Sequence, residues 1–577
     1  MQKMIASGLL ITFLLAGSCK KDPVTPTGEQ VVLNLTTDKA AYRPGEDIAF
    51  AADKEAPAAA RIRYKYLGEV VEDVAWTGPM WTWTAPATDF RGYMAEVYSK
   101  IGNNELIHGV IAVDVSSDWS RFPRYGFLSS FADTENTESV IAGLTRYHIN
   151  GLQFYDWHYK HHRPLAGTPA NPDPVWKDII NRDIYLNTVE QYITAAHGRN
   201  MQAMFYNLAY GATNTAEADG VAPEWFLFKD PNHTARDFHD LPEPPFNSDI
   251  YVTDPGNPGW QQYLAARNAD VYAVFDFDGF HVDQLGDRGG LYDYAGNQAD
   301  LPSGFRSFNQ AIKAAAPDKK LVFNAVNQFG QAEIAQSPVD FLYTEVWSPN
   351  ESYNDLANII AGNDAYSGRS KKTVLAAYLN YAKADNPGQF NTPGVLLADA
   401  VIFAFGGAHL ELGEHMLGKE YFPNSNLQMT DELKRSLVNY YDFLVAYQNV
   451  LRDGGAVNNP PVTTSGTAFS LNAWPPQPGK VAVAGRDLGS RQVIHLLNFV
   501  NAADLNWRDT NGVRAAAPTL YETRLNLTSS RTVKRIWYAC PDLDGGASRE
   551  LSFSQSGSSV AFEIPFFKYW GMAVVEY

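Results

Sequence analysis

The chain has 577 residues, and its 46 Lys and Arg against 64 Asp and Glu give a formal net charge of −18. At about 100 to 200 residues per domain, this length predicts three or four domains and excludes a single small module. The acidic balance disfavours nucleic acid and anionic membrane surfaces as partners, so a neutral or cationic substrate is expected. Aromatic residues make up 13% of the chain, enough to fill large cores. Composition alone leaves two interpretations open, rings that only fill cores and strands and rings that also serve as flat platforms for sugars.

The N-terminus has the pattern of an export signal. Lys3 precedes an apolar run from Met4 to Ala16, which is shorter than the roughly 20 residues of a membrane-spanning helix. Small residues then lead into Cys19, as in a bacterial lipobox. We therefore expect a lipoprotein-type signal over residues 1–19 with Cys19 lipidated, then a tether over residues 20–30. Plain secretion with an incidental cysteine is the alternative.

This pattern predicts an exported protein at the bacterial cell surface or in the periplasm, in contact with a membrane only through the anchor at Cys19. The other cysteine, Cys540, lies in a strand-like run and is interpreted as a small buried apolar residue rather than a nucleophile. No spacing of Cys and His is typical of zinc. We expect no cofactor, no metal and a monomer.

Three regions follow the tether, each with its own pattern. Residues 31–116 contain short alternating apolar runs separated by turn residues, which predict an immunoglobulin-like β-sandwich. Residues 456–577 show a similar pattern and predict a second, C-terminal β-sandwich. In residues 117–455, apolar runs of strand length alternate with longer helical segments, which predicts a (β/α)₈ barrel. An open doubly wound sheet is the alternative, disfavoured because no glycine-rich phosphate turn follows the first strand.

The middle region contains eight candidate strands, with helix-like stretches such as Trp176 to Ala196 between them. In chain order the strands are Tyr125 to Ser130, Gly151 to Trp157, Gln202 to Leu208, Gly279 to Leu285, Leu321 to Val326, Phe341 to Trp347, Val374 to Asn380 and His409 to Gly413. The chemistry of such barrels lies at the C-terminal ends of the strands.

Polar and aromatic side chains gather at these strand ends, where they suit a substrate rich in hydroxyl groups. The predicted substrate-binding residues are Asp156, Trp157, His158, His161, Tyr206, Asn207, His281, Asp287, Asn324, Trp347, Asn380 and Glu411. Asp287 is ambiguous, because it could instead pair with Arg288. The His158, His161 and His162 group resembles a metal site but follows a strand without a partner carboxylate in register, so we expect no metal there.

Two carboxylates stand out because each ends a strand. On the fourth strand, period two places His281 and Asp283 on one face, and the sixth strand ends at Glu345. Across a barrel mouth these two could lie at the roughly 5 to 5.5 Å of a retaining glycosidase, or at the roughly 6.5 to 9.5 Å of an inverting one. Glu411 and Glu414 are further candidates for a catalytic pair with Asp283, although their closeness in sequence favours substrate contacts or a structural network.

Four segments resemble glycoside hydrolase family 66, which contains dextranases and cycloisomaltooligosaccharide glucanotransferases. They are Gln153 to Trp157 with Lys160 to Leu165, Asp278 to Asp287, Tyr343 to Trp347, and His409 to Leu417 with Glu420 to Pro423. The resemblance implies a retaining attack on α-1,6-glucosidic linkages, with Asp283 as nucleophile and Glu345 as acid/base.

Cyclising members of the family usually carry an inserted carbohydrate-binding module, and no segment here is long enough to be one. The resemblance therefore favours a dextranase that releases isomaltooligosaccharides, in an endo mode. The alternatives are a lipid-anchored glycan-binding protein without activity, and an α-glycosidase or transglycosylase of other specificity.

Overall fold

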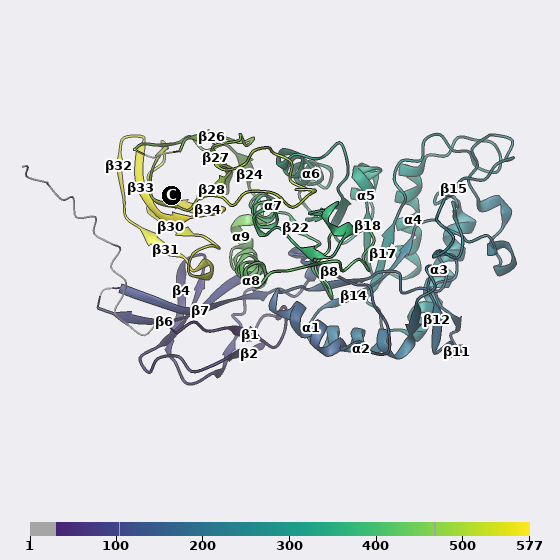
Figure 1. Cartoon of the computed structure of the whole chain (residues 1–577), viewed down its shortest axis with the longest axis horizontal. Coiled ribbons are helices and arrows are strands. Elements are labelled where there is room, and N and C mark those ends of the chain that lie inside the picture. The colour runs from purple at the N-terminus through teal and green to yellow at the C-terminus, as the bar shows by residue number, and fades with distance from the viewer. Residues whose placement is uncertain (1–30, 103, 467–468) are drawn as a thin grey trace, which may run out of the picture.

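The computed structural model describes residues 31–102, 104–466 and 469–577. The predicted signal, the tether and Cys19 lie outside these residues. The chain forms a central parallel sheet with helices around it, and two regions of antiparallel sheet that lie together at one side of it (Figure 1). No helix in the described part of the chain combines the length and apolar character needed to span a bilayer.

Eight parallel strands build the central sheet, in the order β22-β20-β19-β18-β17-β14-β9-β8. Each falls within or close to one predicted strand, so the eight-stranded parallel sheet is confirmed. The strands are β8 (Tyr125–Leu128), β9 (Gly151–Phe154), β14 (Gln202–Leu208), β17 (Gly279–Asp283), β18 (Lys320–Asn324), β19 (Leu342–Glu345), β20 (Thr373–Ala376) and β22 (Ala408–His409).

The two edges of this sheet meet. The backbone N–H of Phe127 on β8 donates to the carbonyl of Leu412, just past β22, at 3.1 Å. A Cβ on Gly413 would lie 2.5 Å from the carbonyl oxygen of Phe127, so only glycine permits this approach. The sheet therefore closes as a (β/α)₈ barrel, and residues such as Met204, Val322 and Tyr343 fill its interior.

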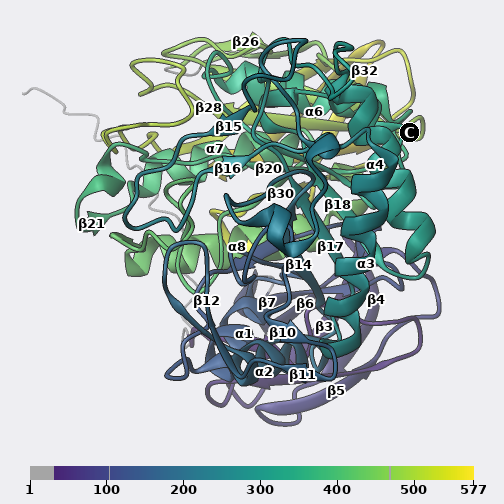
Figure 2. The ribbon, with the colours of Figure 1, turned by 90° about the vertical axis from the view of Figure 1, so that its right-hand side faces the viewer.

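Helices cover the outside of the barrel (Figure 2). They begin after side-chain caps in several cases, for example Asn257 before α3 and Ser352 before α6, which satisfies free N–H groups of the first turn. The helices are α1 (Thr137–Arg146), α2 (Leu186–His197), α3 (Pro258–Val274), α4 (Leu301–Ala315), α5 (Gln331–Ala335), α6 (Tyr353–Tyr366), α7 (Thr392–Ala404), α8 (Asp431–Ala446) and α9 (Gln448–Leu451).

One helix prediction was wrong in its first half. Trp176 to Tyr185 is not helical, because β12 (Val175–Lys177) and β13 (Asp183–Tyr185) pair as an antiparallel hairpin. The carboxylate of Asp178 accepts from the backbone N–H groups of Ile180 at 3.0 Å and Arg182 at 2.8 Å. This side chain stabilises the turn in place of a helix.

Each flanking region consists of two sheets over an apolar core, and their strands pair in antiparallel fashion except β26, which pairs with β27 in parallel. The immunoglobulin-like type of the first region stays a prediction. The N-terminal strands are β1 (Leu35–Thr37), β2 (Asp47–Ala52), β3 (Arg61–Tyr66), β4 (Glu69–Ala75), β5 (Met80–Thr84), β6 (Arg91–Ile101) and β7 (Asn104–Val115). The C-terminal strands are β24 (Ala456–Asn458), β25 (Val462–Thr464), β26 (Leu471–Ala473), β27 (Val481–Asp487), β28 (Arg491–Asn498), β29 (Leu520–Thr528), β30 (Arg535–Ala539), β31 (Arg549–Leu551), β32 (Phe553–Ser556), β33 (Ser559–Phe567) and β34 (Trp570–Glu576).

Both regions are tied to the barrel by buried polar contacts. The carboxylate of Asp442 on α8 accepts from the backbone N–H of Ala112 on β7 at 2.8 Å and pairs with Arg146 at the end of α1. From the C-terminal region, the guanidinium of Arg508 donates to the carbonyl of Val346 at 2.9 Å and to that of Tyr378 at 3.2 Å. Arg508 thereby supports the loops that follow β19 and β20.

Candidate active site

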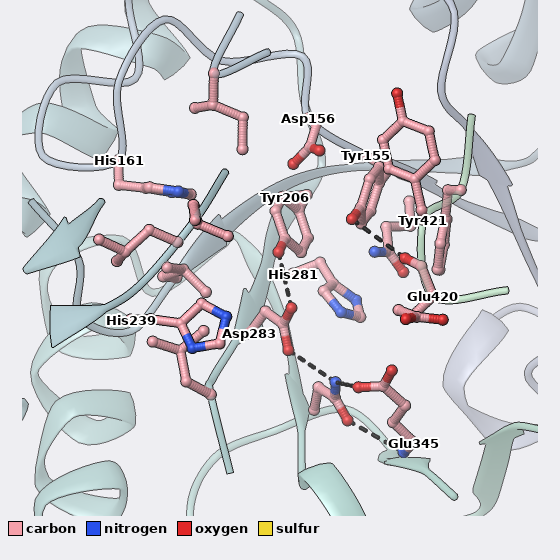
Figure 3. A pocket seen from close by; sticks show the side chains of 18 of the residues that line it. Tyr155, Asp156, His161, Tyr206, His239, His281, Asp283, Glu345, Glu420 and Tyr421 are labelled. Atoms are coloured by element: carbon pink, nitrogen blue, oxygen red, sulfur yellow. Dashed lines mark hydrogen bonds between the residues drawn. The ribbon is translucent and has the colours of Figure 1, made fainter. Parts of the chain in front are cut away.

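A cavity of about 450 Å³ opens at the C-terminal ends of the barrel strands (Figure 3). Seven of the predicted site residues line it, and they come from β14, β17, β18 and β19 or from the loop after β9. They are Asp156, His161, Tyr206, His281, Asn324 and the two predicted catalytic carboxylates, Asp283 and Glu345. The barrel thus brings together side chains that are up to 189 residues apart in the sequence, from Asp156 to Glu345.

Asp283 is the last residue of β17 and is held by three hydrogen-bond donors. The hydroxyl of Tyr206 donates to Oδ2 at 2.8 Å, while Nδ2 of Asn324 at 2.7 Å and the backbone N–H of Gln284 at 2.8 Å donate to Oδ1. Tyr206 reaches Asp283 because β14 pairs with β17 in parallel, with Tyr206 opposite His281. All three groups donate hydrogen bonds to the carboxylate of Asp283, and such contacts favour its ionised form.

Glu345 is the last residue of β19 and faces the same cavity. The hydroxyl of Tyr378 donates to Oε1 at 2.7 Å, and Nδ2 of Asn324 lies 3.2 Å from Oε2. Asn324 ends β18, which lies between β17 and β19 in the sheet. Its amide can therefore bridge the two carboxylates, and this places Asp283 and Glu345 side by side (Figure 3).

The two carboxylates differ in their affinity for protons. Burial, and after it the charge of Asp283, raise the pKa of Glu345 to about 7. Burial also raises the pKa of Asp283, but the hydrogen bonds from Tyr206, Gln284 and Asn324 oppose that shift. Near neutral pH the pair can thus hold one proton, on Glu345, beside an ionised Asp283.

Asp156 reaches the cavity through an unusual backbone conformation. Its φ is +50°, in the left-handed region that non-glycine residues seldom adopt. The side chain lines the cavity although the residue is only 3% exposed. Burial raises its pKa to about 8, against the opposing charge of Arg182. Such strain at a cavity wall is typical of a functional position.

The cavity histidines are neutral. Burial lowers the pKa of His281 to about 3 and that of His161 to about 4. Nδ1 of His281 lies 3.2 Å from the hydroxyl of Tyr125, inside the barrel, and Nδ1 of His161 lies 2.9 Å from Oδ1 of Asn207. Both rings can exchange hydrogen bonds with hydroxyl groups without adding charge.

Four predicted binding residues lie outside the cavity and are wholly buried: Trp157, His158, Asn207 and Asn380. The ring of Trp157 packs behind the sheet against Phe275 and Phe277, so it has no open face for a sugar and its prediction as a platform was wrong. Asn207 instead supports His161, and Asn380 binds the backbone carbonyl of Asp509 at 2.8 Å.

Two further predicted residues are accessible but do not line the cavity. Asp287 is exposed, and its carboxylate accepts from the backbone N–H of Gly289 at 2.9 Å, while Arg288 pairs with Asp237 instead. Trp347 is half-buried and packs against Tyr378 and Tyr381. Trp347 therefore supports Tyr378, which donates to Glu345, from outside the cavity wall.

Glu411 belongs to a sealed cluster rather than to the cavity. Its Oε1 accepts from the hydroxyl of Tyr441 at 3.0 Å, and Nδ1 of His409 lies 2.8 Å from Asp399 and 3.4 Å from Glu411. Within the described ranges, Asp399, His409 and Glu411 form the one group of three such side chains close enough to hold a metal ion. Burial raises the pKa of Glu411 to about 8 and that of Asp399 further above its usual value, so protons can neutralise the pair.

Several cavity residues were missed as candidates, namely Tyr155, His239, Tyr378, Glu420, Tyr421 and Phe422. Tyr155 directly precedes Asp156 at a strand end, a signal that was available. Glu420 accepts from the hydroxyl of Tyr381 at 2.7 Å and lies in a loop after the last strand. His239 lies in the long connection between β14 and α3, where no periodic pattern marks a site.

Comparison of the sequence with known proteins identifies a family. Residues 37–574 match the sequence model of glycosyl hydrolase family 66. A cycloisomaltooligosaccharide glucanotransferase of Niallia circulans is 28% identical over 98% of this chain and 74% of its own length. A dextranase of Streptococcus salivarius is 25% identical over 74% of this chain and 58% of its own length.

A solved structure gives the same answer at the level of the fold. The cycloisomaltooligosaccharide glucanotransferase of Paenibacillus sp., complexed with cycloisomaltoheptaose, superposes with a TM-score of 0.84 at 26% identity, covering 94% of this chain and 99% of that one. The family match spans nearly all the described residues, including the cavity and both flanking regions. The chain therefore belongs to glycosyl hydrolase family 66.

Proposed function

We propose that the protein hydrolyses α-1,6-glucosidic linkages within dextran chains and releases isomaltooligosaccharides with retained α configuration. The observation that carries this proposal is the pair Asp283 and Glu345, bridged by the amide of Asn324 in one cavity, in a chain that belongs to family 66. The names of its relatives, a dextranase and cycloisomaltooligosaccharide glucanotransferases, support an α-1,6-glucan as the substrate.

The spacing of the carboxylates supports retention. Nδ2 of Asn324 lies 2.7 Å from Oδ1 of Asp283 and 3.2 Å from Oε2 of Glu345, so these two oxygens are no further apart than the sum of the two distances. That limit falls below the roughly 6.5 to 9.5 Å that an inverting enzyme needs to fit a water between its carboxylates. It suits the shorter spacing at which one carboxylate attacks the sugar directly.

In the first step, Oδ of Asp283 attacks the anomeric carbon while Glu345 donates its proton to the leaving glycosidic oxygen. A glycosyl ester on Asp283 forms, and the glucan beyond the cleaved bond departs as an alcohol. The hydroxyl of Tyr206 and the amide of Asn324 hold the attacking carboxylate in place. Loss of charge on Asp283 then lowers the pKa of Glu345, because their repulsion ends.

In the second step, the ionised Glu345 takes a proton from water, whose oxygen attacks the anomeric carbon and breaks the ester to Asp283. Both carboxyl groups return to their starting states. The two inversions at one carbon give net retention. A glucan hydroxyl in place of water would give transglycosylation instead.

The choice of hydrolysis over cyclisation rests on one of the two glucanotransferase comparisons, since this chain covers 99% of the solved Paenibacillus enzyme. The alignment with the Niallia circulans glucanotransferase runs over 743 residues, more than the 577 residues of this chain, so that relative carries segments that this chain lacks. We infer that this chain has less surface to hold a long glucan end near the glycosyl ester, and that water is the usual acceptor.

Incubation with dextran and, separately, with starch tests the proposal, with products followed by chromatography and by NMR of the first anomer. Linear isomaltooligosaccharides in the α form, from dextran alone, are expected. Cyclic products would show that the enzyme transfers glucan rather than hydrolysing it. An initial β anomer would reject retention. Binding of dextran without any cleavage would favour the non-catalytic alternative. A fall in viscosity ahead of reducing-end release would show cutting within the chain.

A further inference from the structure

Arg508 connects the C-terminal region to the two segments that carry Glu345 and its hydroxyl donor. It lies between β28 and β29 and is 7% exposed. Nη2 donates to the carbonyl of Val346, the residue after Glu345, at 2.9 Å, and Nη1 donates to the carbonyl of Tyr378 at 3.2 Å. The hydroxyl of Tyr378 in turn donates to Oε1 of Glu345 at 2.7 Å. One guanidinium thus holds the backbone next to Glu345 and the backbone of its donor.

The central sheet does not reach as far as Tyr378. The pairing of β19 with β20 ends at Glu345 and Ala376, the last residues of these strands. The backbone N–H of Val346 still donates to the carbonyl of Ala376 at 3.0 Å, but Tyr378 lies beyond this end of the ladder. A planar guanidinium presents its donors in a fixed geometry, so Arg508 extends the set spacing of the two strands to Tyr378.

The segment around Arg508 is itself fixed to the barrel. The indole of Trp507 is fully buried, and its Nε1 donates to the carbonyl of Asn350 at 2.8 Å. The backbone N–H of Asn380 donates to the carbonyl of Arg508 at 2.9 Å. The guanidinium carbon lies 4.6 Å from the ring centroid of Trp507 and 5.2 Å from that of Trp347, distances at which cation–π attraction acts. Arg508 therefore has little freedom to turn away from its two carbonyls.

One of the titratable groups that face Glu345 is hydrogen-bonded to Arg508. The groups that face Glu345 are Tyr155, Asp283, Tyr343, Tyr378 and Glu420. Those that face Arg508 are Glu351, Tyr378, Tyr381 and Glu420. The hydrogen bond from Tyr378 lowers the pKa of Glu345, against burial and the charges of Asp283 and Glu420, which raise it. A displaced Tyr378 would therefore leave Glu345 with a higher pKa.

We propose that Arg508 is a positioning residue through which the C-terminal region orients Tyr378 and Glu345 for proton transfer. Arg508 does not line the active-site cavity, so it acts through these two residues and not on the substrate. The C-terminal region then takes part in the proposed reaction in addition to covering the barrel. The inference rests on the proposed function, because it takes Glu345 as the acid/base.

The test compares Arg508→Ala with Arg514→Ala. Arg514 lies in the same connection between β28 and β29, but it pairs with Asp504 of the C-terminal region at 2.8 Å. Arg508→Ala should lower kcat/KM on dextran about 10-fold, because a misplaced acid/base transfers its proton less well. The alkaline limb of its pH profile should move upward by roughly 0.5 to 1 pH unit, because Tyr378 no longer lowers the pKa of Glu345. Arg514→Ala should keep the wild-type pH profile, and denaturant unfolding compares the stability of the two variants.

Two further variants show whether Arg508 acts through Tyr378. Tyr378→Phe removes the hydroxyl donor and should move the alkaline limb upward by a similar amount. The double variant should add no further shift, because both changes break the same contact. Arg508→Lys keeps the charge, but a single ammonium cannot hold two carbonyls as the planar guanidinium does. Its alkaline limb should also move upward, and it replaces Arg508→Ala if that variant does not fold.

A wild-type alkaline limb in folded Arg508→Ala or in Arg508→Lys would overturn the inference, and so would shifts that add up in the double variant. An equal shift in Arg514→Ala would assign the effect to general destabilisation and would overturn it as well. Wild-type protein without activity on dextran, or Glu345→Gln with near-native activity, would contradict the proposed function and with it the role of Arg508.

Discussion

Two carboxyl clusters in the barrel each contain one aspartate and one glutamate, and they differ in their surroundings. Asp283 and Glu345 line the open cavity and accept hydrogen bonds from Tyr206, Asn324 and Tyr378. Asp399 and Glu411 are at most 1% exposed and lie against Tyr441 of α8. Both clusters hold carboxyls with raised pKa values. A raised pKa therefore does not identify a catalytic pair, and access to a cavity is the feature that separates the two.

The largest expected effect separates the clusters by activity. Asp283→Asn and Glu345→Gln should each lower kcat/KM on dextran by about 10⁴-fold, because in the proposed mechanism each removes a group that reacts in every turnover. Glu411→Gln, a matched change in the sealed cluster, should stay within a few-fold of the wild type. Reducing-end release measures all three, with circular dichroism as the control for folding. Near-native activity in either of the first two variants would contradict the assignment.

The two roles within the open pair can be separated with an external nucleophile. In Asp283→Ala, azide should attack the face that the carboxylate left and give a β-glycosyl azide. In Glu345→Ala, the glycosyl ester still forms from a substrate with a good leaving group, and azide should give the α product. NMR of the azide adducts reads this directly, and the reverse pairing of products would exchange the two roles.

A smaller effect is expected from the residue that bridges the open pair. Asn324→Ala should lower kcat about 10²-fold, because misplacement of a reacting group costs about this much. It should also move the alkaline limb of the pH profile, since one hydrogen bond to each carboxylate is lost. Asn324→Asp, which keeps the shape but adds charge, should move that limb upward. A change in KM with kcat and pH profile intact would make Asn324 a substrate contact only.

The sealed cluster should show its importance in stability instead. Glu411→Ala removes the acceptor of the Tyr441 hydroxyl and leaves a gap beside the His409–Asp399 pair, so it is expected to lower the free energy of unfolding by about 3 kcal/mol. Glu550→Ala, on the exposed surface, should stay within about 0.5 kcal/mol of the wild type. Denaturant unfolding measures both. Equal stability of the two variants would show that Glu411 is not needed for the stability of the fold.

The last predictions concern pH, which should act on activity through the open pair and on stability through the sealed cluster. The proposed mechanism requires ionised Asp283 and protonated Glu345, so kcat/KM should fall as pH drops through the pKa of Asp283, above 3.8, and as pH rises through about 7. Stability from Glu411 is complete below its ordinary pKa of 4.5 and should be lost as pH rises through about 8. In Glu411→Gln the unfolding free energy should depend less on pH in that window. An alkaline activity limb near 4.5 would contradict the role of Glu345.

The sequence by itself determined the parallel sheet, the order of its strands and the two catalytic candidates. Apolar runs of strand length fix where strands form, and the alternation of side chains fixes which residues face inward. Asp283 and Glu345 could be found because each ends such a run. The family resemblance rested on short segments around the same strand ends and was confirmed by the match over residues 37–574.

Only the tertiary structure decided which polar strand-end residues reach the cavity. Trp157 comes one residue after Asp156, yet the left-handed backbone of Asp156 lies at the cavity wall while Trp157 packs behind the sheet. Sequence position could not show that Asn324 bridges two carboxylates or that Glu411 is sealed under α8. These outcomes depend on strand register, barrel closure and the packing of distant segments, which join residues far apart in the chain and leave no local pattern.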